Sequence, residues 1–355
     1  MNRSHAALRA VWRLFPESIR RLTFAQTLKH AVRGADPPAP AHAPAAPPDI
    51  DPVRVIETLA ELDDVLRDLD RRAAISDDEL RAGFERFRMR ASDGPSDDPD
   101  SEAYRARQFA LYERIAGRPY TPANEVSTFD PIATADRPFP YQTASASTVG
   151  GHLIAIGFLI RQLGLRRGSS VLEFGPGWGN LTLALARMGH RVTAVDVEAN
   201  FVKLIDERSR RKNLAIETIH GDFSLVDHLD RTFDVVLFFE SFHHCANHQA
   251  LVASLDRVVA PGGQVVFAGE PIYPWFPQPW GLRLDGESLW QIRRQGWLEL
   301  GFREDYFLDL LARCGWTVTK SVCRELEGAQ GGWGTVFVAK RTAASGSGHS
   351  AQIST

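Results

Sequence analysis

The chain has 355 residues, of which 44% are hydrophobic and 24% are charged, a composition typical of a globular protein. Its 41 Lys and Arg residues nearly balance its 44 Asp and Glu residues, which argues against nucleic acid as a partner because nucleic-acid-binding chains carry a basic excess. The three cysteines, Cys245, Cys314 and Cys323, are few and odd in number. This favours reduced thiols over a disulfide framework and predicts a cytoplasmic protein.

Residues 1–35 are expected to form a basic amphipathic helical segment. Leu8, Trp12, Phe15 and Ile19 recur at helical spacing among many arginines. One interpretation is that this apolar stripe docks on the rest of the protein or on a second subunit, as in a homodimer. The other is that it lies on an anionic membrane surface, which would make the protein membrane-associated.

Residues 36–52 are rich in Pro and Ala, a composition that predicts a linker. Residues 53–140 are predicted to be a helical accessory region. Leucines recur at helical spacing between positions 59 and 69, and Ser76 with Glu79 predicts the start of a second helix. The uncharged stretch over 138–160 has too short an apolar part for a bilayer span, which needs about 20 residues, so we expect a buried helix there.

Residues 141–340 alternate short apolar strands with helices, which predicts parallel strands joined by crossover helices. We therefore predict an α/β fold: a doubly wound, mostly parallel, seven-stranded Rossmann-like sheet with an N-terminal helical extension. Ligands of such sheets lie at the carboxyl ends of the strands. Residues 341–355, rich in Ser, Gly and Ala, are expected to be a disordered tail. The predicted strands are Val171–Phe174, Val192–Val195, Ala215–Ile219, Val235–Phe239, Val265–Ala268, Thr317–Val322 and Gly334–Ala339.

The first predicted strand opens into a glycine-rich turn containing Gly175, Gly177 and Gly179. Glycines let the backbone turn tightly and approach a ligand. The spacing is G-x-G-x-G, whereas a dinucleotide site has G-x-G-x-x-G, and Asn180 occupies the position of its third glycine. Glu173, just before the turn, also disfavours phosphates and favours a ligand with a cationic group.

This acidic residue followed by G-x-G-x-G resembles the first motif of the class I S-adenosylmethionine (SAM)-dependent methyltransferases, and the resemblance extends over about residues 170–340. It implies SAM as cofactor. In that family the glycine loop passes under the methionine and ribose portion of SAM, which implies this role for Glu173, Gly175, Gly177 and Gly179.

Two further acids follow strands. Asp196 ends the second strand, where a carboxylate can accept hydrogen bonds from the ribose hydroxyls; the alternative is that it caps the helix that starts near Glu198. The resemblance implies that Asp222 bonds the adenine amino group and that Phe223 packs on the adenine ring.

The fourth strand ends at Glu240 and precedes a histidine pair, His243 and His244, of a kind found after this strand in the family. A hydroxyl acceptor benefits from a base within hydrogen-bond reach, so Glu240, His244 and Glu270 are the candidate catalytic residues, and His243 is assigned to substrate binding. The pair, with Cys245, His248 and Glu240, also suggests a metal site. We expect no metal, because adjacent histidines on a loop do not converge easily.

Residues 270–303 form an insert after the fifth strand that contains four tryptophans, Trp275, Trp280, Trp290 and Trp297. We assign Trp275, Trp280 and Arg283 to the acceptor pocket, because aromatic faces with nearby polar groups suit a hydroxylated ring. The alternative is that the tryptophans build a packed lid or a dimer contact. The insert resembles methyltransferases of bacterial surface-polysaccharide pathways.

Three functions follow from these patterns. The first is O-methylation of a hydroxyl on a sugar or glycan precursor. The second is methylation of a lipid, a quinone or another small metabolite. The third is a non-catalytic regulatory protein that binds SAM.

Overall fold

The computed structural model describes residues 53–90, 98–326 and 333–342, which all belong to one structural unit. The predicted basic helix over residues 1–35 and the linker over 36–52 lie outside the described residues, as does most of the predicted tail.

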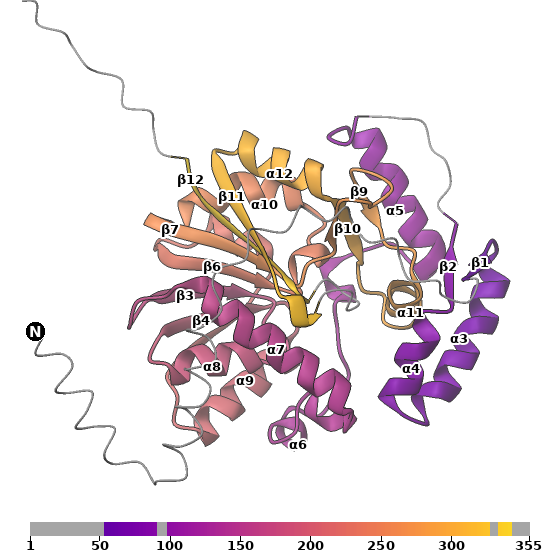
Figure 1. The fold of residues 1–355 in the computed structure, drawn as a ribbon, viewed down its shortest axis with the longest axis horizontal. Coiled ribbons are helices and arrows are strands. Elements are labelled where there is room, and N and C mark those ends of the chain that lie inside the picture. The colour runs from indigo at the N-terminus through magenta and orange to yellow at the C-terminus, as the bar shows by residue number, and fades with distance from the viewer. Residues whose placement is uncertain (1–52, 91–97, 327–332, 343–355) are drawn as a thin grey trace, which may run out of the picture. The chain divides into compact units, whose positions relative to one another are not determined.

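A seven-stranded sheet forms the centre of the molecule (Figure 1). The strand order is β11-β12-β7-β6-β3-β4-β5, and neighbouring strands from β7 to β5 pair in parallel. β12 pairs antiparallel with both β7 and β11, so the sheet is mixed at one edge. The prediction of a mostly parallel seven-stranded α/β sheet is confirmed. The strands are β3 (Ser170–Phe174), β4 (Arg191–Asp196), β5 (Ile216–His220), β6 (Phe233–Phe239), β7 (Val259–Ala268), β11 (Trp316–Val322) and β12 (Thr335–Arg341).

Helices cover both faces of this sheet because the central strands are apolar on both sides. In β6, Val235 and Leu237 pack with α7 (Ala146–Leu163) and α8 (Asn180–Arg187) in one core cluster. Val236 and Phe238 pack into the other cluster, with α10 (His248–Ser254) and α12 (Glu304–Arg313). The arrangement is doubly wound, with α9 (Ala199–Arg211) packed beside β4 and β5.

Helix α7 satisfies the length and composition of a membrane span. Its residues Ile156, Leu159 and Leu163 are buried against the sheet, which is the position of a core helix in a folded domain. Length and composition alone are therefore weak evidence for a span.

The N-terminal described region consists of β1 (Arg54–Ile56), α3 (Leu59–Ala73), α4 (Asp77–Phe84), β2 (Phe87–Met89) and α5 (Glu102–Ala116). Each helix begins at a capping residue whose side chain accepts a backbone N–H: Thr58, Ser76 and Ser101. Thr58 and Glu61 form a reciprocal capping box.

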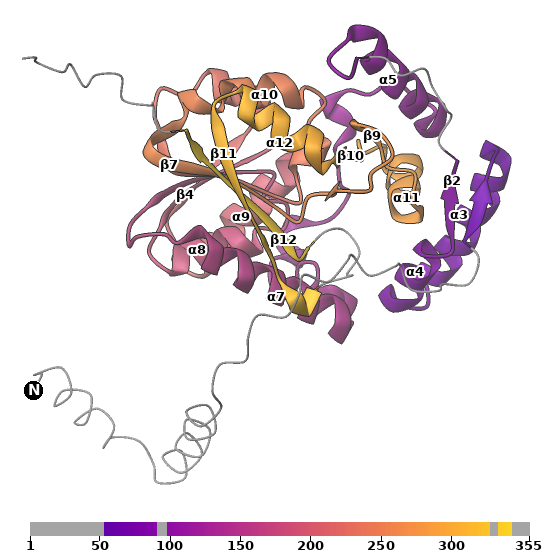
Figure 2. The ribbon, with the colours of Figure 1, turned by 45° about the horizontal axis from the view of Figure 1, so that its top comes forward.

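The insert packs against this N-terminal region rather than standing alone. It contains a three-stranded sheet in the order β8-β10-β9, with β8 (Ile272–Tyr273), β9 (Trp280–Leu282) and β10 (Leu300–Arg303), and one helix, α11 (Gly286–Arg294). The ring centroids of Trp280 and Tyr104 of α5 lie 5.2 Å apart, and Arg293 forms an ion pair with Asp63 of α3. The elements from β1 to α5 and residues 270–303 thus form one body beside the sheet, here called the accessory lobe (Figure 2).

Candidate active site

A cavity of about 800 Å³ lies between the carboxyl ends of the sheet strands and the accessory lobe. Its sheet side is lined by the loops after β3, β4, β5 and β6, and its lobe side by α4 and α11. The lining includes Gly175, Gly177, Asp196, Asp222, Phe223, Glu240, Ser241, His243 and His244 from the sheet side, and Arg81, Phe84, Arg283, Trp290, Gln291, Trp297 and Glu299 from the lobe side.

The glycine loop has the backbone that the sequence requires. Gly175 has a φ of 62°, and a Cβ on it would meet the Cβ of the buried Ser241 at 2.5 Å. Gly177 has a φ of 50°, and nothing lies within 4 Å of where its Cβ would be. Gly175 therefore lets two strand ends come together, whereas Gly177 leaves open space beside the cavity. Gly179, with a φ of 70°, begins α8 and is not among the residues that line the cavity.

Asp196 lies buried at the end of β4 and lines the cavity. One carboxylate oxygen accepts the Gly177 N–H at 3.0 Å and the other accepts the Glu198 N–H at 2.9 Å. Burial raises the pKa of Asp196 to about 6, and the two N–H donors oppose this shift. The carboxylate thus ties the glycine loop to the turn before α9 while it faces the cavity.

Asp222 and Phe223 also line the cavity, after β5. The Asp222 carboxylate accepts the Ser224 N–H at 2.8 Å, so it caps the following turn. The Phe223 ring lies 5.8 Å from that of Phe174 at the end of β3.

Glu173 does not line the cavity, in contrast to its predicted contact with the cofactor. Its side chain is buried and accepts the hydroxyl hydrogen of Thr182 in α8 at 2.7 Å. Burial raises its pKa to about 7. Residues alternate between the two faces of a strand, so a side chain one position before the end of β3 points toward α8 rather than into the loop. Its role is to anchor α8 under the glycine loop.

Glu240 and His244, two predicted catalytic residues, do line the cavity. Glu240 follows β6 with a φ of 54° and accepts a hydrogen bond from the indole N–H of Trp333. Burial raises the pKa of Glu240 to about 8. Burial also lowers the pKa of His244 well below its usual value, which keeps its imidazole neutral.

Glu270, the third predicted catalytic residue, is not among the residues that line the cavity. Its carboxylate accepts three backbone N–H groups, those of Ser241 and Phe242 at 2.9 Å and that of His243 at 3.1 Å. It also contacts Nδ1 of His243 at 2.8 Å. Glu270 is therefore an anchor that fixes the loop after β6, because buried N–H groups need acceptors.

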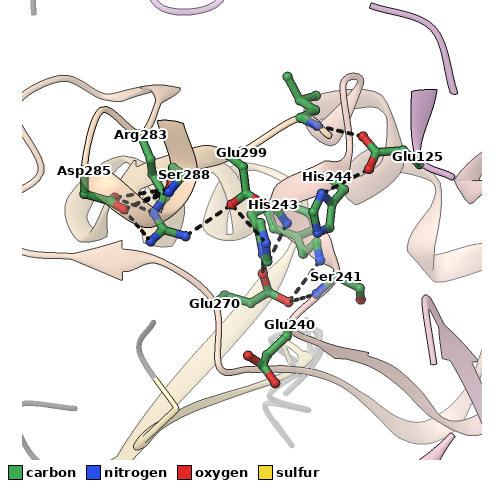
Figure 3. A network of polar contacts seen from close by, with 12 residues as sticks. Glu125, Glu240, Ser241, His243, His244, Glu270, Arg283, Asp285, Ser288 and Glu299 are labelled. Atoms are coloured by element: carbon green, nitrogen blue, oxygen red, sulfur yellow. Dashed lines mark hydrogen bonds and ion pairs between the residues drawn. The ribbon is translucent and has the colours of Figure 1, made fainter. Parts of the chain in front are cut away.

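Three side chains meet near this anchor: His243, His244 and Glu299, here called the histidine cluster (Figure 3). Nε2 of His243 lies 3.8 Å from a carboxylate oxygen of Glu299, and Nδ1 of His244 lies 3.4 Å from an oxygen of Glu125. Adjacent histidines therefore do converge here, contrary to the expectation from the sequence. Cys245, His248 and Glu240 are not members of the cluster.

The two tryptophans assigned to the acceptor pocket from the sequence, Trp275 and Trp280, lie elsewhere in the insert. Trp280 is fully buried, and its indole N–H donates to the Pro99 carbonyl oxygen at 2.8 Å. Trp275 is 73% exposed and stacks on Tyr273 with ring centroids 4.6 Å apart. Neither residue lines the cavity, whereas Arg283 does. The aromatic residues that line the lobe side and its rim are Phe84, Tyr120, Trp290, Trp297 and Trp333.

The sheet side of the cavity fits SAM better than a dinucleotide. Among the described lining residues, the Arg and Lys side chains are Arg81 and Arg283, and both come from the accessory lobe. A pyrophosphate near the glycine loop would therefore depend on backbone N–H groups alone, without an Arg or Lys side chain from the lining of the sheet side. SAM carries no phosphate, its sulfonium and ammonium groups are cationic, and Asp196 offers a carboxylate to its ribose.

The family comparison agrees with this geometry, because residues 172–267 match the model of a methyltransferase domain. The match runs from β3 to β7 and so includes the loops that line the sheet side of the cavity. It supports a SAM-dependent methyltransferase with SAM as cofactor.

Curated relatives resemble a part of this chain. The demethylmenaquinone methyltransferase of Tropheryma whipplei is 30% identical over 107 residues, which are 30% of this chain and 44% of that protein. The ubiquinone biosynthesis O-methyltransferase of Maricaulis maris is 32% identical over 102 residues, 28% of this chain and 40% of that protein. The chain thus spans less than half the length of either relative. The predicted resemblance to polysaccharide-pathway methyltransferases finds no support in these two relatives.

Among solved structures, the chain is similar to the 1,6-didemethyltoxoflavin-N1-methyltransferase of Burkholderia thailandensis. The TM-score is 0.42 at 19% identity, over 71% of this chain and 93% of that one.

Proposed function

We propose that this protein transfers a methyl group from SAM to a hydroxyl oxygen on an aromatic ring of a small molecule. The observation that carries the proposal is that one cavity joins the glycine loop and Asp196 to the carboxylate of Glu240 and to an aromatic wall on the accessory lobe. A methyl donor and an acceptor would therefore meet in a single enclosed space, as methyl transfer requires.

The lobe side of the cavity favours a flat aromatic acceptor, such as a quinol. Trp290 and Trp297 line the cavity, and stacking against an indole ring favours another planar ring. The indole N–H of Trp290 and the amide oxygen of Gln291 are buried and have no hydrogen-bond partner among the described residues, so one donor and one acceptor could bind polar groups of the acceptor. Two relatives are named for quinone methylation, which agrees with this acceptor class. The sugar hypothesis depended on Trp275 and Trp280, which do not line the cavity.

SAM, when bound, supplies an electrophilic methyl group. The residues of the chain position the acceptor and exclude water. Glu240 takes the proton of the acceptor hydroxyl, since one of its oxygens is held by Trp333 and a pKa of about 8 suits a base at neutral to slightly alkaline pH. The neighbouring Ser241 touches Gly175, so this base stands directly beside the cofactor loop.

The test is transfer of labelled methyl by the full-length protein to three sets of acceptors: hydroxylated quinol analogues, nucleotide sugars and lipid extracts. We expect labelled product with the quinol analogues and little with the sugars. Product with sugars alone would replace this acceptor class with the glycan alternative. Tight SAM binding without turnover on any set would favour the regulatory alternative.

A further inference from the structure

The histidine cluster places two imidazoles and one carboxylate at the wall of the cavity. One candidate ligand atom from each of His243, His244 and Glu299 lies within 4.8 Å of the others. Glu299 comes from the insert, whereas the histidines follow β6, so two separate segments build the cluster (Figure 3). All three residues line the cavity.

His243 is held in one orientation by a buried carboxylate. Its Nδ1 contacts Glu270 at 2.8 Å, and that carboxylate is itself fixed by three backbone N–H groups. The Nδ1 position therefore carries the proton, and Nε2 presents its lone pair toward Glu299 at 3.8 Å. A histidine whose second nitrogen donates to a carboxylate is the usual arrangement around a bound metal ion.

Nδ1 of His244 offers a second nitrogen. This atom is buried, has no hydrogen-bond partner within the part of the chain that the structure describes, and lies 3.4 Å from a carboxylate oxygen of Glu125. Burial lowers the pKa values of both His243 and His244, so both rings are neutral, the form that binds metal ions.

Three carboxyl groups lie around the cluster. Glu125, Glu270 and Glu299 all contact its histidines or belong to it. Arg283 contacts Glu299 at 3.3 Å, but it also makes two bonds with its own neighbour Asp285. A buried carboxyl group either keeps its proton or is compensated by a cation, so this set of oxygens can accommodate a cationic ligand.

We propose that His243, His244 and Glu299 bind a divalent transition-metal ion of the zinc class, with an open position for the acceptor oxygen. Two histidines and one glutamate form a known ligand set for catalytic zinc. Zn–N and Zn–O distances are about 2.0–2.2 Å, so the three ligand atoms, which lie within 4.8 Å of one another, would have to move closer together around an ion. The inference depends on the proposed function in one respect: the ion would hold the acceptor hydroxyl and lower its pKa, so that Glu240 can remove the proton more easily.

The test uses Co²⁺ as a coloured substitute for Zn²⁺, titrated into full-length protein that has been stripped with a chelator. We expect one equivalent of Co²⁺ to give visible absorption bands that Zn²⁺ then removes. His243→Gln and Glu299→Gln should weaken Co²⁺ binding by more than about 100-fold, since even partners outside the ligand set change metal affinity by about 10- to 100-fold. His228→Ala, which removes an exposed histidine outside the cluster, should bind Co²⁺ like the wild type.

Circular dichroism shows whether each variant is folded. If His243→Gln does not fold, Glu299→Gln still tests the site, because this substitution keeps the size of the side chain. Equal Co²⁺ affinity in folded Glu299→Gln and His228→Ala, or no stoichiometric binding in the wild type, would overturn the metal site. The methyltransferase proposal fails separately: it is overturned when SAM does not bind, whatever the Co²⁺ spectrum. Full methyl transfer by protein that binds no Co²⁺ would reject the metal and keep the transfer function.

Discussion

The two sides of the cavity are built in different ways. The sheet side consists of loops that follow adjacent parallel strands, and Gly175, Gly177 and Asp196 contact one another or the next strand end through the backbone. The lobe side consists of side chains from segments far apart in the chain, such as Phe84 of α4 and Trp290 of α11, whose rings lie 5.8 Å apart. On the sheet side, backbone geometry suits a ligand that stays the same among related proteins. On the lobe side, substitutions of side chains can change which ligand is bound.

Glu270, the first residue of the insert, holds the loop after β6 through hydrogen bonds. Among the substitutions considered, replacing it should lower the stability of the fold most. Glu270→Gln keeps one acceptor oxygen but turns an amide N–H₂ toward donors, so about two charged hydrogen bonds are lost. At about 1.5–3 kcal/mol each, the free energy of unfolding should fall by about 3–6 kcal/mol. Urea denaturation measures this loss.

The matched control is Glu173→Gln, an equally buried glutamate whose carboxylate accepts one hydrogen bond from the described residues, that of the Thr182 hydroxyl. It should lose much less stability, because an amide oxygen can accept the same hydroxyl. Similar losses in the two variants would contradict the anchoring role of Glu270.

Two glycine substitutions separate fold from cofactor binding on the sheet side. Both Gly175→Ala and Gly177→Ala place a side chain at positive φ, which costs about 1–2 kcal/mol. Gly175→Ala adds a clash with the buried Ser241 and should lower the melting temperature more. Gly177→Ala meets open space and should mainly weaken SAM binding. Thermal melting and calorimetry on both variants test this division. A lower melting temperature for Gly177→Ala than for Gly175→Ala, with weaker SAM binding in Gly175→Ala, would contradict it.

Glu240 should set the pH dependence of methyl transfer. A base is active when deprotonated, and its pKa is raised to about 8, so kcat/KM should rise as the pH increases through about 8 and level off above it. The groups that face Glu240 are Trp333, Arg81, Glu287 and Glu270. Glu240→Gln should be slow and should lose this rise, whereas an unchanged profile in the variant would assign the ionisation to another group.

The smallest expected effect concerns the acceptor wall. Trp290→Leu should raise the KM for a quinol analogue about 2- to 10-fold, because stacking contributes about 0.5–1.5 kcal/mol. SAM affinity should not change. Trp275→Leu is the control, since this exposed ring stacks on Tyr273 outside the cavity. A larger increase in KM for Trp275→Leu than for Trp290→Leu would indicate that the acceptor binds at Trp275, as the sequence predicts.

The sequence predicts the sheet side well because its pattern is local. The glycine turn and Asp196 each follow a strand directly, and parallel strands bring their carboxyl ends to one edge. A spacing motif does not state to which side of the strand the Glu173 carboxylate points, so its contact with Thr182 cannot be predicted from the sequence. The same holds for the backbone hydrogen bonds that fix Glu270.

The lobe side could not be predicted to the same depth because its contacts are long-range. Trp280 packs against Tyr104 and His248, which lie in other elements, and is therefore core. Glu299 reaches the histidine pair only because the insert folds back over the loop after β6. Ser76 and Glu79 predict the start of the helix that carries Arg81 and Phe84, but no local pattern says that this helix lines a cavity.

The central claim is that the sheet side of the cavity binds SAM, and calorimetry on the full-length protein tests it most directly. S-adenosylhomocysteine should bind with one site per chain, and NAD should not bind. Asp196→Ala should weaken binding about 10- to 100-fold, since it removes a charged hydrogen-bond partner that contributes about 1.5–3 kcal/mol. Asp230→Ala, at an exposed position, should bind like the wild type. Tighter binding of NAD than of S-adenosylhomocysteine, or unchanged affinity in folded Asp196→Ala, would contradict the account.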